Sequence, residues 1–298
     1  MVTTDTPRPY SCFRGLGTAL VTPFLPDGAV DYTALQRLVE QQLRAQVDFL
    51  VVLGTTAEAA TMSASERLQV QRFIAQVVDG RLPLMIGVGG NNTAAVCDAL
   101  RETDLSAFSA VLSVCPYYNK PNQEGLFRHF CAVAEASPLP VVLYNVPGRT
   151  GVNLLPETVM RILAACGEKV LGIKEASGNV EQIKRLIMLR DRAHSPLLVI
   201  SGDDGIASTL MHAGADGLIS VASNAYPEVF GTIVRKADDA LQGQYADMIQ
   251  LLFREGNPTG IKALLSVKEH IHNVLRLPLV PASDVLMTDI RREAAALS

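Results

Sequence analysis

A regular alternation of short apolar runs with longer amphipathic segments constrains the fold of this chain more than any other feature. The apolar runs occupy residues 17–24, 48–55, 82–88, 110–117, 139–146, 170–174, 197–201 and 216–221. Each run is almost continuously apolar, which is typical of strands that are covered on both faces. Strictly alternating strands and helices predict a parallel sheet, and eight such units are the number that closes a (β/α)8 barrel.

The segments between these runs carry the signals of helices. Asp31 precedes apolar residues at helical spacing and can cap a helix, and Ser63 with Glu66 has the spacing of a capping box. Pro156 suits the first turn of another helix. A doubly wound open sheet is the alternative, but it would ordinarily show G-x-G-x-x-G after the first strand, and the glycines at 15 and 17 lack the third.

The C-terminal quarter of the chain differs from the rest because it contains no further convincing strand. Helical patterns cover 228–246, 248–254, 260–275 and 283–296. We therefore expect an α/β protein with a (β/α)8 TIM barrel in residues 1–224 and a helical appendix in residues 225–298, whose first helix closes the barrel. Residues 1–14 are expected to form a loose tail.

Composition excludes several classes of protein. The chain is 48% hydrophobic and 19% charged, which fits a soluble globular protein, and its net charge of −4 without a basic run predicts no nucleic-acid partner. No apolar run approaches the roughly 20 residues that cross a bilayer. The five cysteines are scattered without a C-x-x-C pair, which favours a reducing compartment. The first dozen residues lack the apolar core of a signal peptide, so we expect a cytoplasmic protein that binds no membrane.

Lys174 is the residue that most directly suggests chemistry, because it lies inside the apolar run at 170–174. Burial disfavours the charged ammonium, and a neutral lysine amine can attack a carbonyl to form a Schiff base. The structural alternative is a strand-end lysine that reaches solvent or pairs with Glu175. Since neighbouring residues of a strand point to opposite faces, Glu175 is expected to have a structural role on the other side.

The carboxyl ends of the other strands are also polar, and in a barrel these ends meet at one mouth. The polar segments are 54–58, 116–121, 144–151 and 201–204. Each has a structural interpretation of its own, as a helix cap, an aromatic packing group or a turn. Their convergence with Lys174 favours a catalytic mouth, in which a tyrosine can relay protons and an arginine can hold a carboxylate. We therefore expect an aldol-type condensation or cleavage of a keto acid.

Two other barrel chemistries fit the sequence less well. A metal-dependent aldolase needs histidine and carboxylate ligands at strand ends, whereas all five histidines fall in expected helices or loops. A phosphate-binding barrel needs a glycine-rich loop after strand seven or eight, where Asp203 and Asp204 would instead repel phosphate. We expect no metal and no cofactor.

The motifs at these strand ends resemble the pyruvate-dependent class I aldolases, the family of dihydrodipicolinate synthase and N-acetylneuraminate lyase. The resemblance runs from Gly17 to about Leu277 and rests on three motifs, Gly-Thr-Thr-x-Glu at 54–58, Pro-Tyr-Tyr-Asn-Lys-Pro at 116–121 and Tyr-Asn-Val-Pro-Gly-Arg-Thr-Gly at 144–151. The motifs are most similar to the synthase branch, because the lyase branch usually lacks the arginine of the last one. The resemblance implies condensation of pyruvate with L-aspartate 4-semialdehyde to 4-hydroxy-tetrahydrodipicolinate, a step of lysine and diaminopimelate synthesis.

The resemblance also implies a role for individual residues. By motif, Lys174 forms the imine with pyruvate, Tyr144 is its proton donor and acceptor, and Thr55 links Tyr144 to a tyrosine from a neighbouring subunit, which Tyr118 matches. The remaining implied groups are Thr56 for the pyruvate carboxylate, Arg149 for the carboxylate of the semialdehyde, and Gly202 with Ile219 in the pocket wall. The family is usually a homotetramer built from two tight dimers.

The sequence departs from the family pattern in two places, and each departure leads to an expectation. Ala57 replaces the usual glycine of the first motif, which costs about 1 kcal/mol if that position requires a positive φ and nothing otherwise. In the pocket where some members bind lysine as an inhibitor, Asn91 and Tyr117 fit. Positions that carry histidine and glutamate in inhibited enzymes are instead Ala64, Arg67 and Ala95. We expect weak or absent inhibition by lysine.

Two other functions stay open at this point. A sister aldolase or dehydratase that acts on a sugar-derived 2-keto acid would share the imine chemistry, but Arg149 favours a substrate with a carboxylate over a polyhydroxylated one. A non-catalytic binding homologue is the third possibility. The presence of Lys174, Tyr144, Thr55 and Tyr118 together argues against it.

Overall fold

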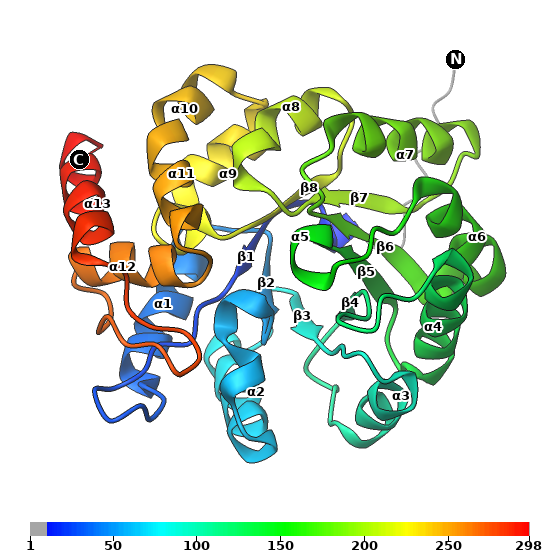
Figure 1. Cartoon of the computed structure of the whole chain (residues 1–298), viewed down its shortest axis with the longest axis horizontal. Coiled ribbons are helices and arrows are strands. Elements are labelled where there is room, and N and C mark those ends of the chain that lie inside the picture. Colours follow the sequence, from blue (N-terminus) through cyan, green and yellow to red (C-terminus); the bar gives the residue numbers. More distant parts are fainter. Residues whose placement is uncertain (1–10, 298) are drawn as a thin grey trace.

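Eight parallel strands close into a barrel in the computed structural model, which describes residues 11–297 (Figure 1). The strands are β1 Gly15–Ala19, β2 Phe49–Val52, β3 Leu84–Gly87, β4 Ala110–Val114, β5 Val141–Asn145, β6 Val170–Glu175, β7 Leu198–Ser201 and β8 Gly217–Ser220. Each pairs with the next in sequence order, and β8 pairs with β1. The predicted (β/α)8 barrel is confirmed.

Helices surround this barrel and extend to one side of it (Figure 1). Those up to the last strand are α1 Tyr32–Arg44, α2 Ala64–Val78, α3 Thr93–Glu102, α4 Gln123–Ala136, α5 Pro147–Thr150, α6 Pro156–Cys166, α7 Val180–Arg192 and α8 Ala207–His212. The C-terminal helices are α9 Pro227–Lys236, α10 Asp239–Gln244, α11 Ala246–Arg254, α12 Thr259–Val267 and α13 Asp284–Ala296. Asp31 caps α1 and the Ser63–Glu66 capping box begins α2, as the sequence predicts.

The helices depart from expectation in three places. The helix expected over 228–246 is interrupted, because Ala237 adopts a left-handed φ of 49° and Asp238 caps a new helix. The helix expected over 260–275 ends at Val267. The short helix α5 was not expected from the sequence.

The start of the described chain is packed rather than loose, which corrects the expectation for residues 11–14. Ser11–Phe13 forms a turn of 3₁₀ helix, and the Phe13 side chain is fully buried. Its ring meets Phe49 edge-on, with 5.3 Å between centroids. Arg14 forms an ion pair with Asp216. The rest of the expected tail, residues 1–10, lies outside the described residues.

The core has two layers. One lies inside the barrel and includes Phe13, Phe49, Met85, Tyr144 and Ile219. The other fills the space between the strands and the surrounding helices. Strands buried on both faces by these layers are the reason for the continuous apolar runs in the sequence.

The C-terminal helices are packed onto the barrel. Helix α9 contacts β1 and β8, while α11, α12 and α13 contact one another. The division of the chain at residue 224 stays a prediction. Within residues 11–297, no helix is long and apolar enough to cross a membrane.

Phe13 is expected to contribute strongly to stability because it fills the inside of the barrel. Phe13→Ala should lower the free energy of unfolding by about 3–5 kcal/mol, through lost transfer energy and the cavity left behind. Urea denaturation measures this, with Phe253→Ala as the control, since Phe253 is 39% exposed. Equal, small effects of both substitutions would contradict the packing role.

Candidate active site

Lys174 and Tyr144 lie side by side near the carboxyl ends of two neighbouring strands. They are partners in the register of β5 and β6, so both side chains point to the same side of the sheet. The Tyr144 ring belongs to the apolar layer inside the barrel. The Lys174 amine Nζ lies 4.4 Å from the centroid of that ring. Lys174 and Tyr144 therefore lie at the same end of the barrel, while their predicted roles stay predictions.

Lys174 is buried without a charged partner. Its side chain is 6% exposed, and it makes no hydrogen bond or ion pair with any residue in the described range 11–297. A buried lysine ordinarily has a carboxylate beside it, because an unpaired ammonium is costly in an apolar setting. Within residues 11–297, the Lys174 amine therefore lies beside the Tyr144 ring without a counter-charge, and a lysine amine so placed can serve as a nucleophile toward a carbonyl.

Glu175 points to the opposite face of β6, as the alternation of strand side chains predicts. Its carboxylate accepts hydrogen bonds from Asn145 Nδ2 at 3.0 and 3.1 Å, from the Ser177 N–H at 2.8 Å and from Gln182 Nε2 at 3.2 Å. Burial raises the pKa of Glu175, and the hydrogen bonds from Asn145 and Ser177 oppose that rise. Glu175 is thus held among amide groups and does not neutralise Lys174.

Gly202 lies directly against the Lys174 side chain. A Cβ at this position would stand 2.9 Å from Cε and 3.1 Å from Cγ of Lys174. The other expected wall residue, Ile219, is 1% exposed and belongs to the layer inside the barrel. The absence of a side chain at 202 leaves room for the extended lysine.

The Thr-Thr motif forms a tight turn after β2. Residues Thr55–Ala57 are a turn of 3₁₀ helix, with Thr56 buried and Thr55 exposed. The left-handed residues here are Leu53, at φ 55°, and Glu58, at φ 56°, whereas Ala57 is not left-handed. Replacement of the usual glycine by Ala57 therefore causes no left-handed strain.

Glu58 anchors this turn to the C-terminal part of the chain. Its carboxylate forms a fully buried ion pair with Lys262 of α12 and accepts a hydrogen bond from the Arg276 N–H at 3.0 Å. The Lys262 amine also donates to the Val274 carbonyl at 3.0 Å and lies 4.0 Å from the centroid of the Phe24 ring.

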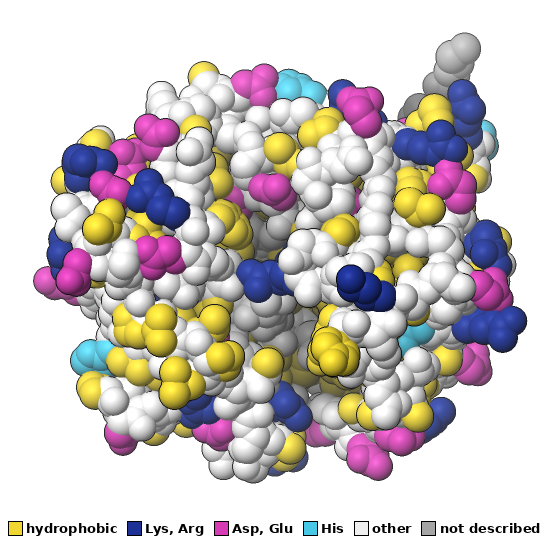
Figure 2. Space-filling view, viewed as in Figure 1, with side chains coloured by type: hydrophobic (Ala, Val, Ile, Leu, Met, Phe, Trp, Pro, Cys, Tyr) yellow, Lys and Arg dark blue, Asp and Glu magenta, His cyan; other side chains and the backbone are white. Residues whose placement is uncertain are grey.

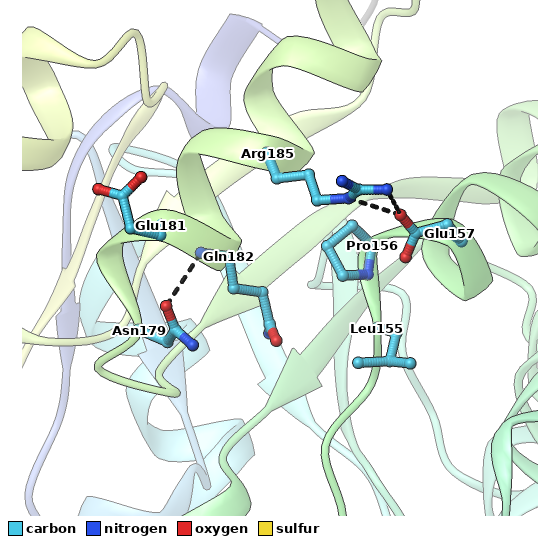
Figure 3. Close-up of a pocket in the computed structure, with 7 residues that line it drawn as sticks. All are labelled: Leu155, Pro156, Glu157, Asn179, Glu181, Gln182 and Arg185. Carbon is cyan, nitrogen blue, oxygen red and sulfur yellow. Dashed lines mark hydrogen bonds and ion pairs between the residues drawn. The ribbon is translucent and has the colours of Figure 1, made fainter.

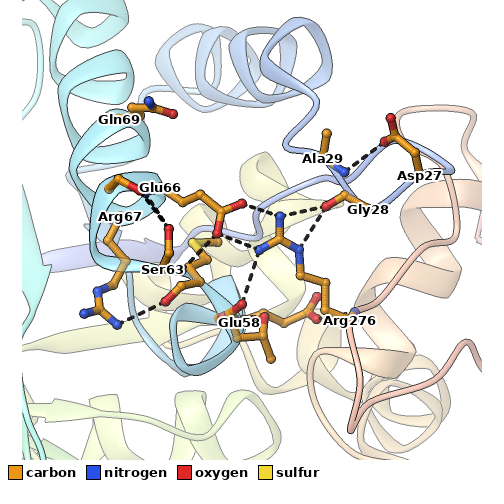
Figure 4. A network of polar contacts seen from close by, with 12 residues as sticks. Asp27, Gly28, Ala29, Glu58, Ser63, Glu66, Arg67, Gln69 and Arg276 are labelled. Atoms are coloured by element: carbon orange, nitrogen blue, oxygen red, sulfur yellow. Dashed lines mark hydrogen bonds and ion pairs between the residues drawn. The ribbon is translucent and has the colours of Figure 1, made fainter.

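Arg276 extends the same network, which Figure 4 shows. Its guanidinium contacts Glu66, donates to the carbonyl of Gly28 at 2.7 Å and donates to that of Thr61 at 3.2 Å. The hydrogen bond from Arg276 is the largest cause that lowers the pKa of Glu66 to about 2. The turn after β2 is thereby tied to helix α2 and to the segment that follows α12.

Arg149 lies in α5 at the mouth, and Asn257 joins it to Thr56. Arg149 Nη2 donates to the carbonyl oxygen of Asn257 at 2.9 Å, and Asn257 Nδ2 donates to Thr56 Oγ1 at 2.9 Å. Asn257, Lys262 and Arg276 were missed in the sequence. A lysine at 262 inside the apolar run 260–265 is the one signal of this network that could have been noticed.

Tyr118 does not reach the rest of the site within one chain. Its side chain is 89% exposed, and its φ of 74° is strained for a non-glycine residue. Within the described part of the chain, the side chains of Tyr118, Thr55 and Tyr144 make no hydrogen bonds with one another. The proton relay predicted from the sequence therefore stays a prediction.

The face that carries the mouth is hollowed near its centre in the space-filling view (Figure 2). A separate hollow of about 530 Å³ lies between the N-terminal ends of α6 and α7 (Figure 3). It is lined by Leu155, Pro156, Glu157, Asn179, Glu181, Gln182 and Arg185, none of which is a predicted site residue. Among residues 11–297, no group of three histidine, cysteine or acidic side chains gathers as metal ligands would.

Comparison with known proteins gives consistent matches. The model of the dihydrodipicolinate synthetase family matches residues 12–296. A 4-hydroxy-tetrahydrodipicolinate synthase from Azobacteroides pseudotrichonymphae is 47% identical over 286 residues, covering 94% of this chain and 95% of its own.

Solved structures that resemble this chain belong to the same family. Dihydrodipicolinate synthase from Thermotoga maritima has a TM-score of 0.91 and 40% identity, covering 96% of this chain and 98% of its own. A monomeric dihydrodipicolinate synthase variant also has a TM-score of 0.91 and 40% identity, with coverage of 97% and 98%.

The contact between Gly202 and Lys174 can be tested by adding one methyl group. In Gly202→Ala the new Cβ would stand 2.8 Å from Cβ of Ala176 and 2.9 Å from Cε of Lys174, so the end of β6 and the lysine side chain must shift. A displaced lysine amine should form its imine with a small 2-keto acid on the order of 10²-fold more slowly. The rate of borohydride-trapped adduct at Lys174, followed by mass spectrometry, measures this. Gly148→Ala is the control, because a Cβ there meets nothing within 4 Å. Unchanged trapping in Gly202→Ala would show that the lysine does not need this space.

Proposed function

The chain belongs to the dihydrodipicolinate synthetase family, and from this membership and the geometry of the barrel mouth we propose that it condenses pyruvate with L-aspartate 4-semialdehyde to 4-hydroxy-tetrahydrodipicolinate, in lysine and diaminopimelate synthesis. One observation carries the proposal: the Lys174 amine is buried, lies beside Tyr144 and has no carboxylate partner among residues 11–297. The reaction needs such an amine and no cofactor.

The first half of the reaction makes a carbon nucleophile from pyruvate. The Lys174 amine attacks the ketone carbon, and loss of water leaves a protonated imine. This imine accepts the electron pair that remains when a proton leaves the methyl group, which gives an enamine. Tyr144 lies beside Lys174 and is 7% exposed. It carries protons to and from the methyl carbon of pyruvate and to the ketone oxygen that leaves as water.

The second half joins the two substrates. The enamine carbon attacks the aldehyde carbon of the semialdehyde, whose oxygen takes up a proton and becomes a hydroxyl. The amino group of the semialdehyde then adds to the imine carbon and displaces the Lys174 amine, which closes the ring. Thr56 holds the carboxylate of pyruvate, Arg149 that of the semialdehyde, and Gly202 and Ile219 bound the pocket.

The proposed proton relay includes a second subunit. Thr55 links Tyr144 to Tyr118 of a neighbouring copy, so a dimer completes the site. This assembly is supported by the exposure of Tyr118 and Tyr117, which are 89% and 44% exposed in the single chain. A strained, exposed aromatic side chain is typical of a residue that packs elsewhere. We further propose a homotetramer made of two such dimers, located in the cytoplasm.

Borohydride trapping with pyruvate tests the imine. The protein should gain the mass of a reduced pyruvate adduct at Lys174, and Lys174→Ala should abolish the adduct and lower kcat/KM by more than about 10³-fold. Lys169→Ala is the control, since Lys169 is exposed in an ion pair with Glu135. A protein without an adduct at Lys174 lacks the proposed mechanism.

Arg149→Ala separates the two substrates. It should still trap pyruvate at saturation but raise KM for the semialdehyde about 10–100-fold, because a hydrogen-bonded charge pair is lost. Steady-state kinetics with each substrate varied in turn measures the difference. An adduct without condensation in the unmodified enzyme would favour a sister aldolase.

Inhibition by lysine is expected to be weak. Ala64 and Ala95 are exposed positions on α2 and α3 without an acid to pair the ammonium of the ligand, and Arg67 adds a positive charge nearby. Activity should remain largely unchanged at millimolar lysine, and Ala95→Glu, which adds a carboxylate, should increase sensitivity. Strong inhibition of the unmodified enzyme would overturn this expectation.

A further inference from the structure

Asn257 makes two contacts that join the parts of the mouth that bind the substrates. It lies between α11 and α12, far along the chain from both partners, and its side chain is 7% exposed. Its side-chain amide donates to Thr56 Oγ1, and its main-chain carbonyl accepts from Arg149 Nη2, each at 2.9 Å. One buried residue therefore touches both of the proposed carboxylate-binding side chains.

The direction of the hydrogen bond to Thr56 decides what that hydroxyl can do. An amide N–H only donates, so the Thr56 oxygen is the acceptor in this contact. The hydroxyl hydrogen has no acceptor among residues 11–297 and is left to donate elsewhere. A carboxylate only accepts hydrogen bonds, so it needs this free hydrogen. Asn257 thus converts Thr56 into a donor for an anion.

The side chain of Asn257 is not arranged for maximal stability. Its Oδ1 is buried and has no hydrogen-bond partner in the described structure. An unsatisfied buried acceptor destabilises a fold, and such groups call for another explanation, a catalytic role among them. The side chain leaves this acceptor unpaired while its N–H groups face Thr56.

The surroundings of Asn257 keep it in place. The Arg149 guanidinium holds its carbonyl, and helix α12 follows directly, with Lys262 paired to Glu58. Glu58 ends the same turn that carries Thr56, so the C-terminal segment holds this turn at two points. Figure 4 shows Glu58 beside Arg276, the other C-terminal residue that binds it.

We propose that Asn257 is a positioning residue for the condensation, which orients the Thr56 hydroxyl so that it donates to the carboxylate of pyruvate. The role rests on the proposed function, because it acts through a group assigned there. Asn257 itself touches neither the reacting carbon nor the departing oxygen.

Two substitutions of Asn257 separate orientation from packing. Asn257→Ala removes the donor, and the pyruvate concentration for half-maximal borohydride trapping should rise about 3–10-fold, as the loss of one neutral hydrogen bond predicts. Asn257→Asp has nearly the same shape but only accepts, so it turns the Thr56 hydrogen away from the substrate and adds a negative charge. The pyruvate concentration for half-maximal trapping should therefore be at least tenfold higher in Asn257→Asp than in Asn257→Ala. KM for the semialdehyde should change less than about threefold, since the carbonyl that Arg149 binds is retained.

A double-mutant cycle with Thr56→Val tests whether Asn257 acts through Thr56. In the Thr56→Val background, Asn257→Ala should cause no further rise in the half-saturation concentration. The Asn257→Asp variant should recover relative to Asn257→Ala as the pH falls, because a protonated carboxyl regains a donor. Asn273→Ala is the matched control, since Asn273 also has a buried, unpaired Oδ1 but does not touch the site.

The outcomes distinguish the two proposals. If the unmodified enzyme traps no pyruvate at Lys174, the proposed function fails. The role of Asn257 is overturned, and the proposed function is not, if the unmodified enzyme traps pyruvate and either of two results is found. In the first, both Asn257 variants have the half-saturation concentration of the unmodified enzyme; in the second, their effects on this concentration add to that of Thr56→Val. Thermal unfolding midpoints close to that of the unmodified enzyme are expected for both variants, and a large drop in both would assign Asn257 a structural role instead.

Discussion

Closure of the barrel is the constraint on which every feature of the mouth depends. The last strand must pair with the first, and the two backbones meet so closely that a Cβ at Gly217 would stand 2.2 Å from the carbonyl oxygen of Gly15. Once the ring of strands is closed, the carboxyl ends of all eight point to one mouth. Residues more than one hundred positions apart then share a site without any direct link along the chain.

The two buried lysines show how environment sets the role of one residue type. Lys262 is fully buried, yet a carboxylate, a carbonyl and an aromatic ring surround its charge, so it stabilises the turn at Glu58. Lys174 is nearly as buried, its amine lies over the face of the Tyr144 ring, and no carboxylate among residues 11–297 pairs with it. The strand geometry of β6 places the adjacent Glu175 among amides on the other face. The proposed nucleophile is thus the buried lysine that has no counter-charge among residues 11–297, whereas the paired lysine has a structural role.

The C-terminal segment contributes to the site as well as to packing. Through Asn257, Lys262 and Arg276 it holds the turn that follows β2 at Thr56 and at Glu58. The short helix α5 is held by the same segment through Arg149. The helical appendix expected from the sequence therefore also supports the geometry of the mouth.

The sequence by itself determined the alternation of strands and helices, the closed barrel and the strand-end residues Lys174, Tyr144, Thr56 and Arg149. These follow from short-range rules, namely apolar periodicity, capping residues and the position of polar groups at strand ends. It also placed Glu175 on the far face, because side chains alternate along a strand.

Only the tertiary structure decided the contacts made by segments that return from far along the chain. Spacing in the sequence carries no information on which loop meets Thr56, so Asn257 was not found, and nothing local marked Phe13 as part of the core. The left-handed residue of the first motif is Glu58 rather than Ala57, since backbone dihedrals depend on how the turn is anchored. Local patterns specify the strands and helices, whereas long-range packing specifies which distant side chains contact the residues of the mouth.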